Sequence, residues 1–208
     1  MLQTKTIEPG TLSVLNNLMN LTELNQFSLV GGTALSLKYG HRTSIDLDLF
    51  STEDFEHETI IESLQNTFGK AFEYRGNYTK WGIFCHIDNV KVDIVYYPHA
   101  IIHSIEKHSE IRLYHDYDLI AMKIQAILGR GKKKDFWDIA ELLEHYTIQE
   151  MMDCHKTNCP SQMLGISIPQ ALTYFVDADE SEEPITIKPL TWNDIKSAIS
   201  TKVRDFLK

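Results

Sequence analysis

The feature that most constrains the fold is a short run in which acidic and apolar residues alternate, Ile45-Asp46-Leu47-Asp48-Leu49. Successive side chains of a β-strand point to opposite faces, so this run predicts a strand whose two carboxylates share one face, roughly 6.6 Å apart along the backbone. Ile45, Leu47 and Leu49 are expected on the other face. An amphipathic strand with a solvated acidic face is the alternative interpretation of the same alternation.

The two carboxylates also predict a binding property. Two carboxylates held about 5 Å apart repel each other by roughly 3 kcal/mol at an effective dielectric of about 20. A divalent cation with oxygen ligands offsets that repulsion. Asp46 and Asp48 are therefore candidate metal ligands.

A glycine pair precedes the acidic run. Residues 27–30 predict a short strand, Gly31-Gly32 follow it, and residues 33–38 predict the first turns of a helix. Glycine lets the backbone approach a ligand closely, and a helix N-terminus offers free amide groups to a phosphate. The alternative interpretation is a plain tight turn.

A third candidate carboxylate lies in a predicted hairpin. Residues 81–87 and 90–97 are rich in β-branched and aromatic residues and flank Asp88-Asn89, two turn formers. In the second strand Asp93 faces away from Val92 and Ile94. If the hairpin lies beside the acidic strand, Asp93 can converge on the same cation.

Helical periodicity marks the rest of the chain. Helices are expected after Pro9, with Thr11 as N-cap, and over residues 53–68, 118–129, 135–146 and 191–207. We therefore expect a mixed α/β core over residues 1–115 and a mainly helical region over residues 116–208 packed on it.

Composition narrows the functional classes. Of the 208 residues 43% are hydrophobic and 24% charged, as in ordinary globular proteins, and no apolar run approaches the roughly 18 residues of a membrane span. The N-terminus lacks the features of a secretory signal, which predicts a cytoplasmic protein with no membrane partner. A net charge of −9 argues against a protein that coats nucleic acid non-specifically, although residues 130–134 form a concentrated basic segment.

The histidines and cysteines carry little functional signal. Six of the nine histidines are scattered without metal-ligand spacing and are expected to be surface or packed residues: His41, His86, His99, His103, His108 and His115. Three cysteines are too few for a disulfide framework and are expected to be ordinary thiols.

Taken together, the motifs resemble the nucleotidyltransferase toxins of the AbiEii/AbiGii family, within the DNA polymerase β-like nucleotidyltransferase superfamily. The resemblance covers roughly residues 25 to 145 and depends on several motifs in order. They are Gly31-Gly32-Thr33, Arg42-x-Ser44-x-Asp46-x-Asp48, Asp93, and Lys123 with Arg130-x-x-x-Lys134-Asp135-x-x-Asp138. The superfamily usually has Gly-Ser where this chain has Gly32-Thr33, and threonine keeps the hydroxyl.

The resemblance implies an α/β (α+β) fold, with a polymerase β-like nucleotidyltransferase core, a mixed sheet and a mainly helical C-terminal region. It implies a Mg²⁺-dependent enzyme, with Mn²⁺ as an alternative metal, that transfers a nucleoside monophosphate from an NTP to an acceptor. The acceptor would be RNA such as tRNA, or protein, and the enzyme would be the toxin of a toxin–antitoxin or abortive-infection system with a cognate antitoxin. Alternatives are a small-molecule, antibiotic-type nucleotidyltransferase and a catalytically silent nucleotide-binding module of the same fold.

The resemblance also implies residue roles. Gly31, Gly32 and Thr33 would hold the triphosphate, and Asp46 and Asp48 would bind metal. Asp93 would bind a second metal or draw a proton from the acceptor hydroxyl. Lys123 and Asp138 match positions associated with activity. Phosphate contacts are expected from Lys123 and Arg130, and Ser44 and Arg42 complete the nucleotide-binding set, with Arg42 expected to brace the site by bidentate pairing with a carboxylate.

Overall fold

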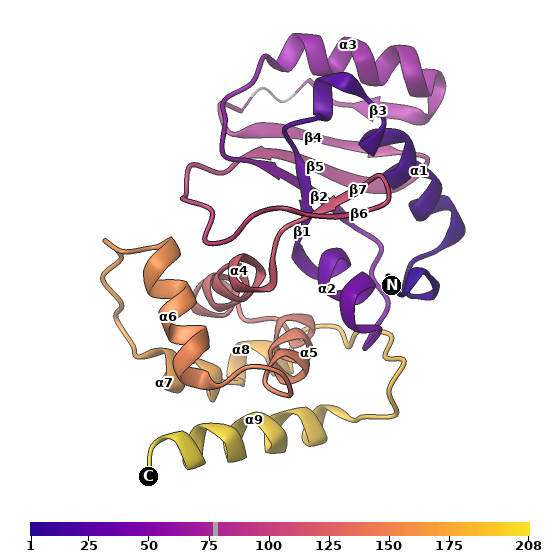
Figure 1. Ribbon diagram of the computed structural model, residues 1–208. Helices are drawn as coiled ribbons and strands as arrows, with labels where there is room; N and C mark the ends of the chain where they lie inside the picture. Colours follow the sequence, from indigo (N-terminus) through magenta and orange to yellow (C-terminus); the bar gives the residue numbers. More distant parts are fainter. Residues whose placement is uncertain (77–78) are drawn as a thin grey trace.

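The computed structural model describes residues 1–76 and 79–208 (Figure 1). Seven strands form one mixed sheet in the order β3-β4-β5-β2-β1-β7-β6. The strands are β1 (Ser28–Val30), β2 (Leu47–Ser51), β3 (Phe72–Tyr74), β4 (Gly82–Ile87), β5 (Val90–Tyr96), β6 (Glu106–His108) and β7 (Ile111–Leu113). The prediction of an α/β fold with a mixed sheet followed by helices is confirmed.

The first three α-helices alternate with strands along the chain, and the six that follow the last strand form the C-terminal half. In Figure 1, α3 lies at one end of the molecule, and α4 to α9 gather at the opposite end. The α-helices are α1 (Pro9–Met19), α2 (Gly31–Tyr39), α3 (His57–Phe68), α4 (Asp116–Gly129), α5 (Lys133–Leu142), α6 (Ile148–Asn158), α7 (Ile168–Leu172), α8 (Val176–Asp179) and α9 (Trp192–Phe206). Short 3₁₀ turns cover Thr4–Thr6, Thr22–Leu24 and Gly69–Ala71.

The β4–β5 hairpin forms as predicted. Asp88 and Asn89 connect the strands with φ of 51° and 64°. Two consecutive positive φ values define a tight hairpin turn whose twist matches that of the strands, and Asp and Asn tolerate this backbone better than most residues.

The acidic strand is shorter than expected. β2 begins at Leu47, so Asp46 precedes it and only Asp48 lies within it. Leu47 and Leu49 are buried in the core as predicted, but Ile45 is 61% exposed. The alternation therefore holds only where β2 pairs with its neighbours, and the expectation for Ile45 is wrong because residue 45 is still in the preceding loop.

Helix ends also differ from expectation. α1 begins at Pro9 with Glu8 as N-cap, and Thr11 is a buried residue inside the helix. Proline suits the first helical position because its φ is already helical and its missing N–H would have no helical partner. α3 begins at His57, later than residue 53. The cap of α9 is as predicted, since Thr191 and Asp194 form a capping box.

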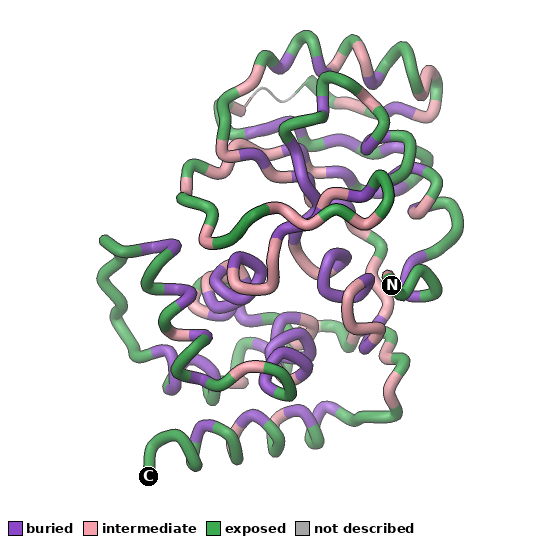
Figure 2. The backbone as a smooth tube through the Cα atoms, in the orientation of Figure 1, coloured by how far each residue is buried: buried purple, intermediate pink, exposed green. Residues whose placement is uncertain are grey.

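The core is continuous between the sheet and the helices. Figure 2 shows buried backbone running through the central strands and into α2, α4 and α5. Val92 and Ile94 of β5 are fully buried, as is Phe136 of α5. Among the described residues, none of the helices has the length and apolar character needed to cross a membrane.

Candidate functional site

The strand register places two carboxylates side by side. β2 and β5 pair in parallel with Asp48 opposite Asp93, so both side chains lie on the same face of the sheet. Burial, together with the negative charge of Asp93, raises the pKa of the Asp48 carboxyl. The Oδ1 atom of Asp93 is buried and has no hydrogen-bond partner among the described residues.

The third carboxylate, Asp46, is paired with a lysine. Asp46 Oδ2 lies 3.5 Å from Lys134 Nζ, and Asp93 forms an ion pair with Lys91. Among residues 1–76 and 79–208, no group of three or more His, Cys, Asp or Glu side chains is arranged to hold a metal ion. The convergence of Asp46, Asp48 and Asp93 on one ion is therefore not preformed in this structure, and lysines supply the positive charge next to two of them.

The donor atoms themselves suit a hard cation. Asp46 and Asp48 line the same pocket and present carboxylate oxygens, the ligands that Mg²⁺ prefers. Asp93, whose Oδ1 has no hydrogen-bond partner among the described residues, lies opposite Asp48. A buried acceptor without a partner costs free energy until a donor or a cation satisfies it. The residues present therefore fit a magnesium ion.

Both glycines of the pair are needed because side chains of the protein occupy the space next to them. Gly31, with φ of 70°, begins α2, and a Cβ atom there would collide with Asp48 Oδ2. A Cβ on Gly32 would collide with Arg42 Nη2. The sequence predicted close approach of a ligand to these glycines, whereas the structure shows that Asp48 and Arg42 already make such an approach.

Thr33 and Ser44 brace the loop that carries the acidic residues. The Thr33 hydroxyl is buried, lies 2.8 Å from Ser44 Oγ and donates to the Asp46 carbonyl oxygen. Ser44 lines the pocket, but Thr33 does not. Thr33 was expected to contact the triphosphate. In the structure its hydroxyl instead fixes the backbone of Asp46.

A buried ionic cluster lies behind the pocket. The Asp138 carboxylate accepts hydrogen bonds from Arg42 Nε at 2.7 Å and Nη2 at 2.8 Å, and lies 2.7 Å from both Lys123 Nζ and His41 Nε2. Lys123 Nζ also lies 3.0 Å from Asp135 Oδ1. Burial alone would raise the pKa of Asp138, but the adjacent charges of Arg42 and Lys123 outweigh it and hold that pKa well below its ordinary value.

The cluster contains three of the predicted site residues, Arg42, Lys123 and Asp138. The bidentate pairing of Arg42 with a carboxylate is confirmed, and its partner is Asp138. Lys123 lines the pocket but its ammonium group is shared between two aspartates, and Asp138 is fully buried and does not line the pocket. The structure thus places Asp138 behind the pocket lining, where it holds Arg42 and Lys123.

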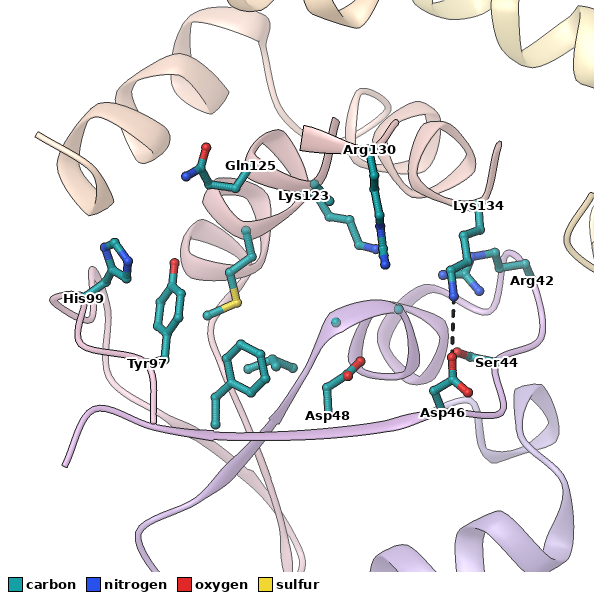
Figure 3. Close-up of a pocket in the computed structure, with 16 residues that line it drawn as sticks. Arg42, Ser44, Asp46, Asp48, Tyr97, His99, Lys123, Gln125, Arg130 and Lys134 are labelled. Carbon is teal, nitrogen blue, oxygen red and sulfur yellow. Dashed lines mark hydrogen bonds and ion pairs between the residues drawn. The ribbon is translucent and has the colours of Figure 1, made fainter. Parts of the chain in front are cut away.

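The candidate site is a cavity of about 420 Å³ between the sheet and α4 (Figure 3). It combines glycines, carboxylates and cationic side chains with aromatic and apolar ones. Its lining consists of Val30, Gly31, Gly32, Arg42, Ser44, Asp46, Asp48, Phe50, Tyr97, His99, Met122, Lys123, Gln125, Ala126, Arg130 and Lys134. Cations fixed beside carboxylates in one cavity can bind a metal–phosphate group and stabilise negative charge that develops on it.

Several lining residues had not been predicted to belong to the site. Lys134 lies in the Arg130-x-x-x-Lys134 motif that carries the family resemblance, but it had been assigned no role in the site. Tyr97 directly follows β5, two residues beyond Val95, which gives a weaker signal. His99 and Gln125 have no signal in the sequence, because neither lies in a recognisable motif.

Comparison with known proteins gives matches over nearly the whole chain. The family model described as "Nucleotidyl transferase AbiEii toxin, Type IV TA system" matches residues 13–206. A protein of Aquifex aeolicus (strain VF5), described as uncharacterized, is 30% identical over 199 residues, which cover 93% of this chain and 94% of the relative.

Solved structures share the fold at low identity. A putative nucleotidyltransferase from Helicobacter pylori superimposes with a TM-score of 0.58 at 15% identity, covering 97% of this chain and 99% of that one. MenT4, a nucleotidyltransferase toxin from Mycobacterium tuberculosis, gives a TM-score of 0.57 at 12% identity, covering 92% of this chain and 80% of that one. With the family match over residues 13–206, the chain belongs to the AbiEii family of nucleotidyltransferase toxins of type IV toxin–antitoxin systems.

Proposed function

We propose that this toxin transfers a nucleoside monophosphate from an NTP to a hydroxyl group of an RNA such as tRNA, with Mg²⁺ bound in the pocket. A protein acceptor and Mn²⁺ are the alternatives to be tested beside them. The observation that carries the proposal is one cavity that brings together Asp46, Asp48, the glycine pair and the cations Arg130 and Lys134. A cognate antitoxin is the expected partner, and the cytoplasm, which holds the NTP pool, is the proposed location.

Asp46 and Asp48 would hold the metal, with Asp93 beside Asp48 as a further ligand or as the base for the acceptor hydroxyl. A bound Mg²⁺ would offset the negative charge of the triphosphate during displacement of pyrophosphate. The raised pKa of Asp48 supports this assignment, because burial next to Asp93 makes its ionised form costly until positive charge is close by.

The cations of the pocket have separate tasks. Arg130 and Lys134 reach the cavity from the end of α4 and the first turn of α5, and they would contact the phosphates directly. Lys123 and Arg42 are fixed by Asp138 and would contribute positive potential without moving. Such preorganised charge stabilises a transition state because it needs no rearrangement during the reaction.

The basic segment favours RNA as the acceptor. Arg130 has a side chain 56% exposed, and Lys132 is also exposed, so both are accessible beside the cavity. Exposed cations next to an active site bind a phosphate backbone through charge alone. The overall charge of −9 confines this attraction to the neighbourhood of the pocket.

The test is transfer of label from each α-³²P-labelled NTP to total RNA, with Mg²⁺, Mn²⁺ or a chelator. We expect Asp48→Asn to lower metal-dependent transfer by about 10²- to 10³-fold, as loss of a group that stabilises transition-state charge does. It should still fold, because it removes repulsion with Asp93. Asp153→Asn, a change at an exposed residue of α6, is the matched control and should keep full activity.

The outcomes separate the candidate functions. Label in the protein fraction would identify a protein acceptor, and label on added hydroxylated antibiotics would favour a small-molecule enzyme. Nucleotide binding without metal-dependent release of pyrophosphate would identify a silent binding module. Full transfer by Asp48→Asn would overturn the proposed site.

A further inference from the structure

The candidate pocket has two chemically different ends. Figure 3 shows Arg42, Lys134 and Asp46 together at one end, and Tyr97 and His99 at the other. Phe50 and Met122 also line the cavity and supply apolar surface. A nucleotide has the same polarity, because its triphosphate is charged and its base is flat and largely apolar on both faces.

The aromatic end is a rigid wall. The ring centroids of Phe50 and Tyr97 are 5.5 Å apart, and those of Tyr97 and His99 are 4.4 Å apart. The Tyr97 hydroxyl donates to Asn158 Oδ1 at 2.7 Å, and Asn158 Nδ2 donates to the Ala100 carbonyl oxygen at 3.1 Å. Asn158, the last residue of α6, is 2% exposed, so it fixes both the ring and the segment after β5. Fixed aromatic faces are suited to stacking on a base.

His99 offers a hydrogen-bond acceptor to this end of the pocket. Its Nδ1 atom lies 3.3 Å from the backbone carbonyl oxygen of Asn158. A carbonyl oxygen can only accept, so Nδ1 carries the hydrogen in this bond. In the neutral ring the lone pair is then on Nε2, which accepts.

Across the cavity from His99, the side-chain amide of Gln125 offers hydrogen-bond donors. Its Oε1 atom lies 3.3 Å from His155 Nε2, so the carbonyl half of the amide is occupied. In the part of the chain that the structure describes, its amide nitrogen makes no hydrogen bond. Gln125 reaches the cavity from α4, across from the Tyr97–His99 side (Figure 3).

His99 and Gln125 also border a second cavity of about 560 Å³, which is lined further by Asn158, Cys159 and Gln162. The two residues therefore form the boundary between two cavities. A flat ligand that lies along the aromatic wall would meet such a boundary with its edge, where the hydrogen-bonding groups of a base are found.

Building on the proposed function, we propose that His99 and Gln125 select the nucleobase of the NTP by pairing an acceptor and a donor with its edge. Tyr97 and Phe50 stack on the base, and Asn158 is a positioning residue for Tyr97 and His99. A site built to hydrogen-bond a base discriminates because the wrong base leaves its polar groups without partners.

The test is isothermal titration of the full-length protein in Mg²⁺ with each of the four NTPs, and with inorganic triphosphate as the probe of the phosphate end. Gln125→Met keeps length without donors, and His99→Phe keeps the ring without an acceptor. We expect each variant to reduce the ratio of best to worst NTP affinity by on the order of tenfold, about the effect of one hydrogen bond. Affinity for inorganic triphosphate should stay within about twofold of the native value, as it should in the control Gln65→Met, at an exposed residue of α3.

The failures of the two proposals are distinguishable. A native protein that binds no NTP would overturn the proposed function. NTP binding with equal affinity for all four bases, or unchanged ratios in both variants, would overturn base selection alone. Loss of inorganic triphosphate binding in a variant would also count against it, because that residue would then belong to the phosphate end.

Discussion

Asp138 organises a pocket that it does not line. It is fully buried and is contacted by Arg42, Lys123 and His41, two of which do line the cavity. A buried charge is tolerated only when partners satisfy it, and removing one member leaves the others uncompensated. Loss of this single carboxylate would therefore release two cations at the candidate site.

Asp138→Asn should lower the free energy of unfolding at pH 7 by about 3 kcal/mol, since Arg42 and Lys123 would lose their shared anion. The pKa of Asp138 is lowered in the folded protein, so its stabilising contribution is complete above the ordinary aspartate pKa of about 3.9 and is lost as pH falls below that value. The variant should accordingly show a weaker loss of stability as pH falls from about 4 to about 2. Urea unfolding across this range is the measurement.

The control is Asp153→Asn, which changes an exposed carboxylate of α6. It should alter the free energy of unfolding by less than about 0.5 kcal/mol. Equal acid sensitivity of the native protein and Asp138→Asn would show that the cluster does not have the electrostatic role assigned to it.

At the scale of single residues, the sequence was informative where chemistry follows local spacing. The alternation around Asp48 and the hairpin turn predicted that Asp93 can lie next to it if the hairpin lies beside the acidic strand, and β5 does pair with β2. The roles of His41 and Thr33 depend on contacts between segments far apart in the chain or on burial, and neither is encoded by spacing. His41, for example, meets Asp138 across 97 positions.

Among the elements, the β4–β5 hairpin sets the position of Asp93. The turn at Asp88-Asn89 fixes the register of β5 against β4, and β5 in turn pairs with β2 so that Asp93 lies opposite Asp48. A shift of one residue would move Asp93 to the other face. The turn therefore sets which face of the hairpin carries Asp93, and the pairing of β5 with β2 brings it opposite Asp48.

Asn89→Val should destabilise the protein by about 1 kcal/mol or more, because a β-branched residue does not tolerate the φ of 64° at this position. Asn89→Gly should preserve or slightly raise stability, since glycine adopts positive φ without strain. Urea unfolding of both variants beside the native protein distinguishes these effects. Equal stability of the two variants would contradict the proposed importance of the turn.

Most long elements were predictable and most short ones were not. The exceptions are β1, which has three residues and was predicted because a glycine pair follows it, and α6, which has eleven and was not predicted. The patterns of α4, α5 and α9 span several turns, so their existence followed from periodicity, with ends displaced by a few residues. The strands β3, β6 and β7 have three residues each, too few to show alternation. α6 to α8 were not predicted; α7 and α8, with five and four residues, are likewise too short for a periodic pattern.

For the whole molecule, the pocket joins the sheet to the C-terminal helices. Asp48 belongs to β2 and Tyr97 directly follows β5, while Gln125 and Lys134 belong to α4 and α5. Tyr97 is additionally held by Asn158 of α6. A ligand in this cavity would touch both halves at once.

Bound NTP with Mg²⁺ should therefore stabilise both halves together. At a free concentration of 100 times its Kd the nucleotide adds about 2.7 kcal/mol to the free energy of unfolding. Hydrogen exchange should slow in β2, in residues 97–99 and in α4 alike, with Mg²⁺ alone as control. Protection restricted to the sheet would show that the helices are not part of the binding site.

The contact between Arg42 and Gly32 makes the glycine requirement conditional. Position 32 excludes a side chain only because a guanidinium group, fixed by Asp138, fills the adjacent volume. If a short residue replaced Arg42, the same position would admit alanine, although the charge beside the helix terminus would be lost. Positions 32 and 42 are thus expected to coevolve. A larger residue at position 32 should be found only in relatives that have a shorter residue at position 42.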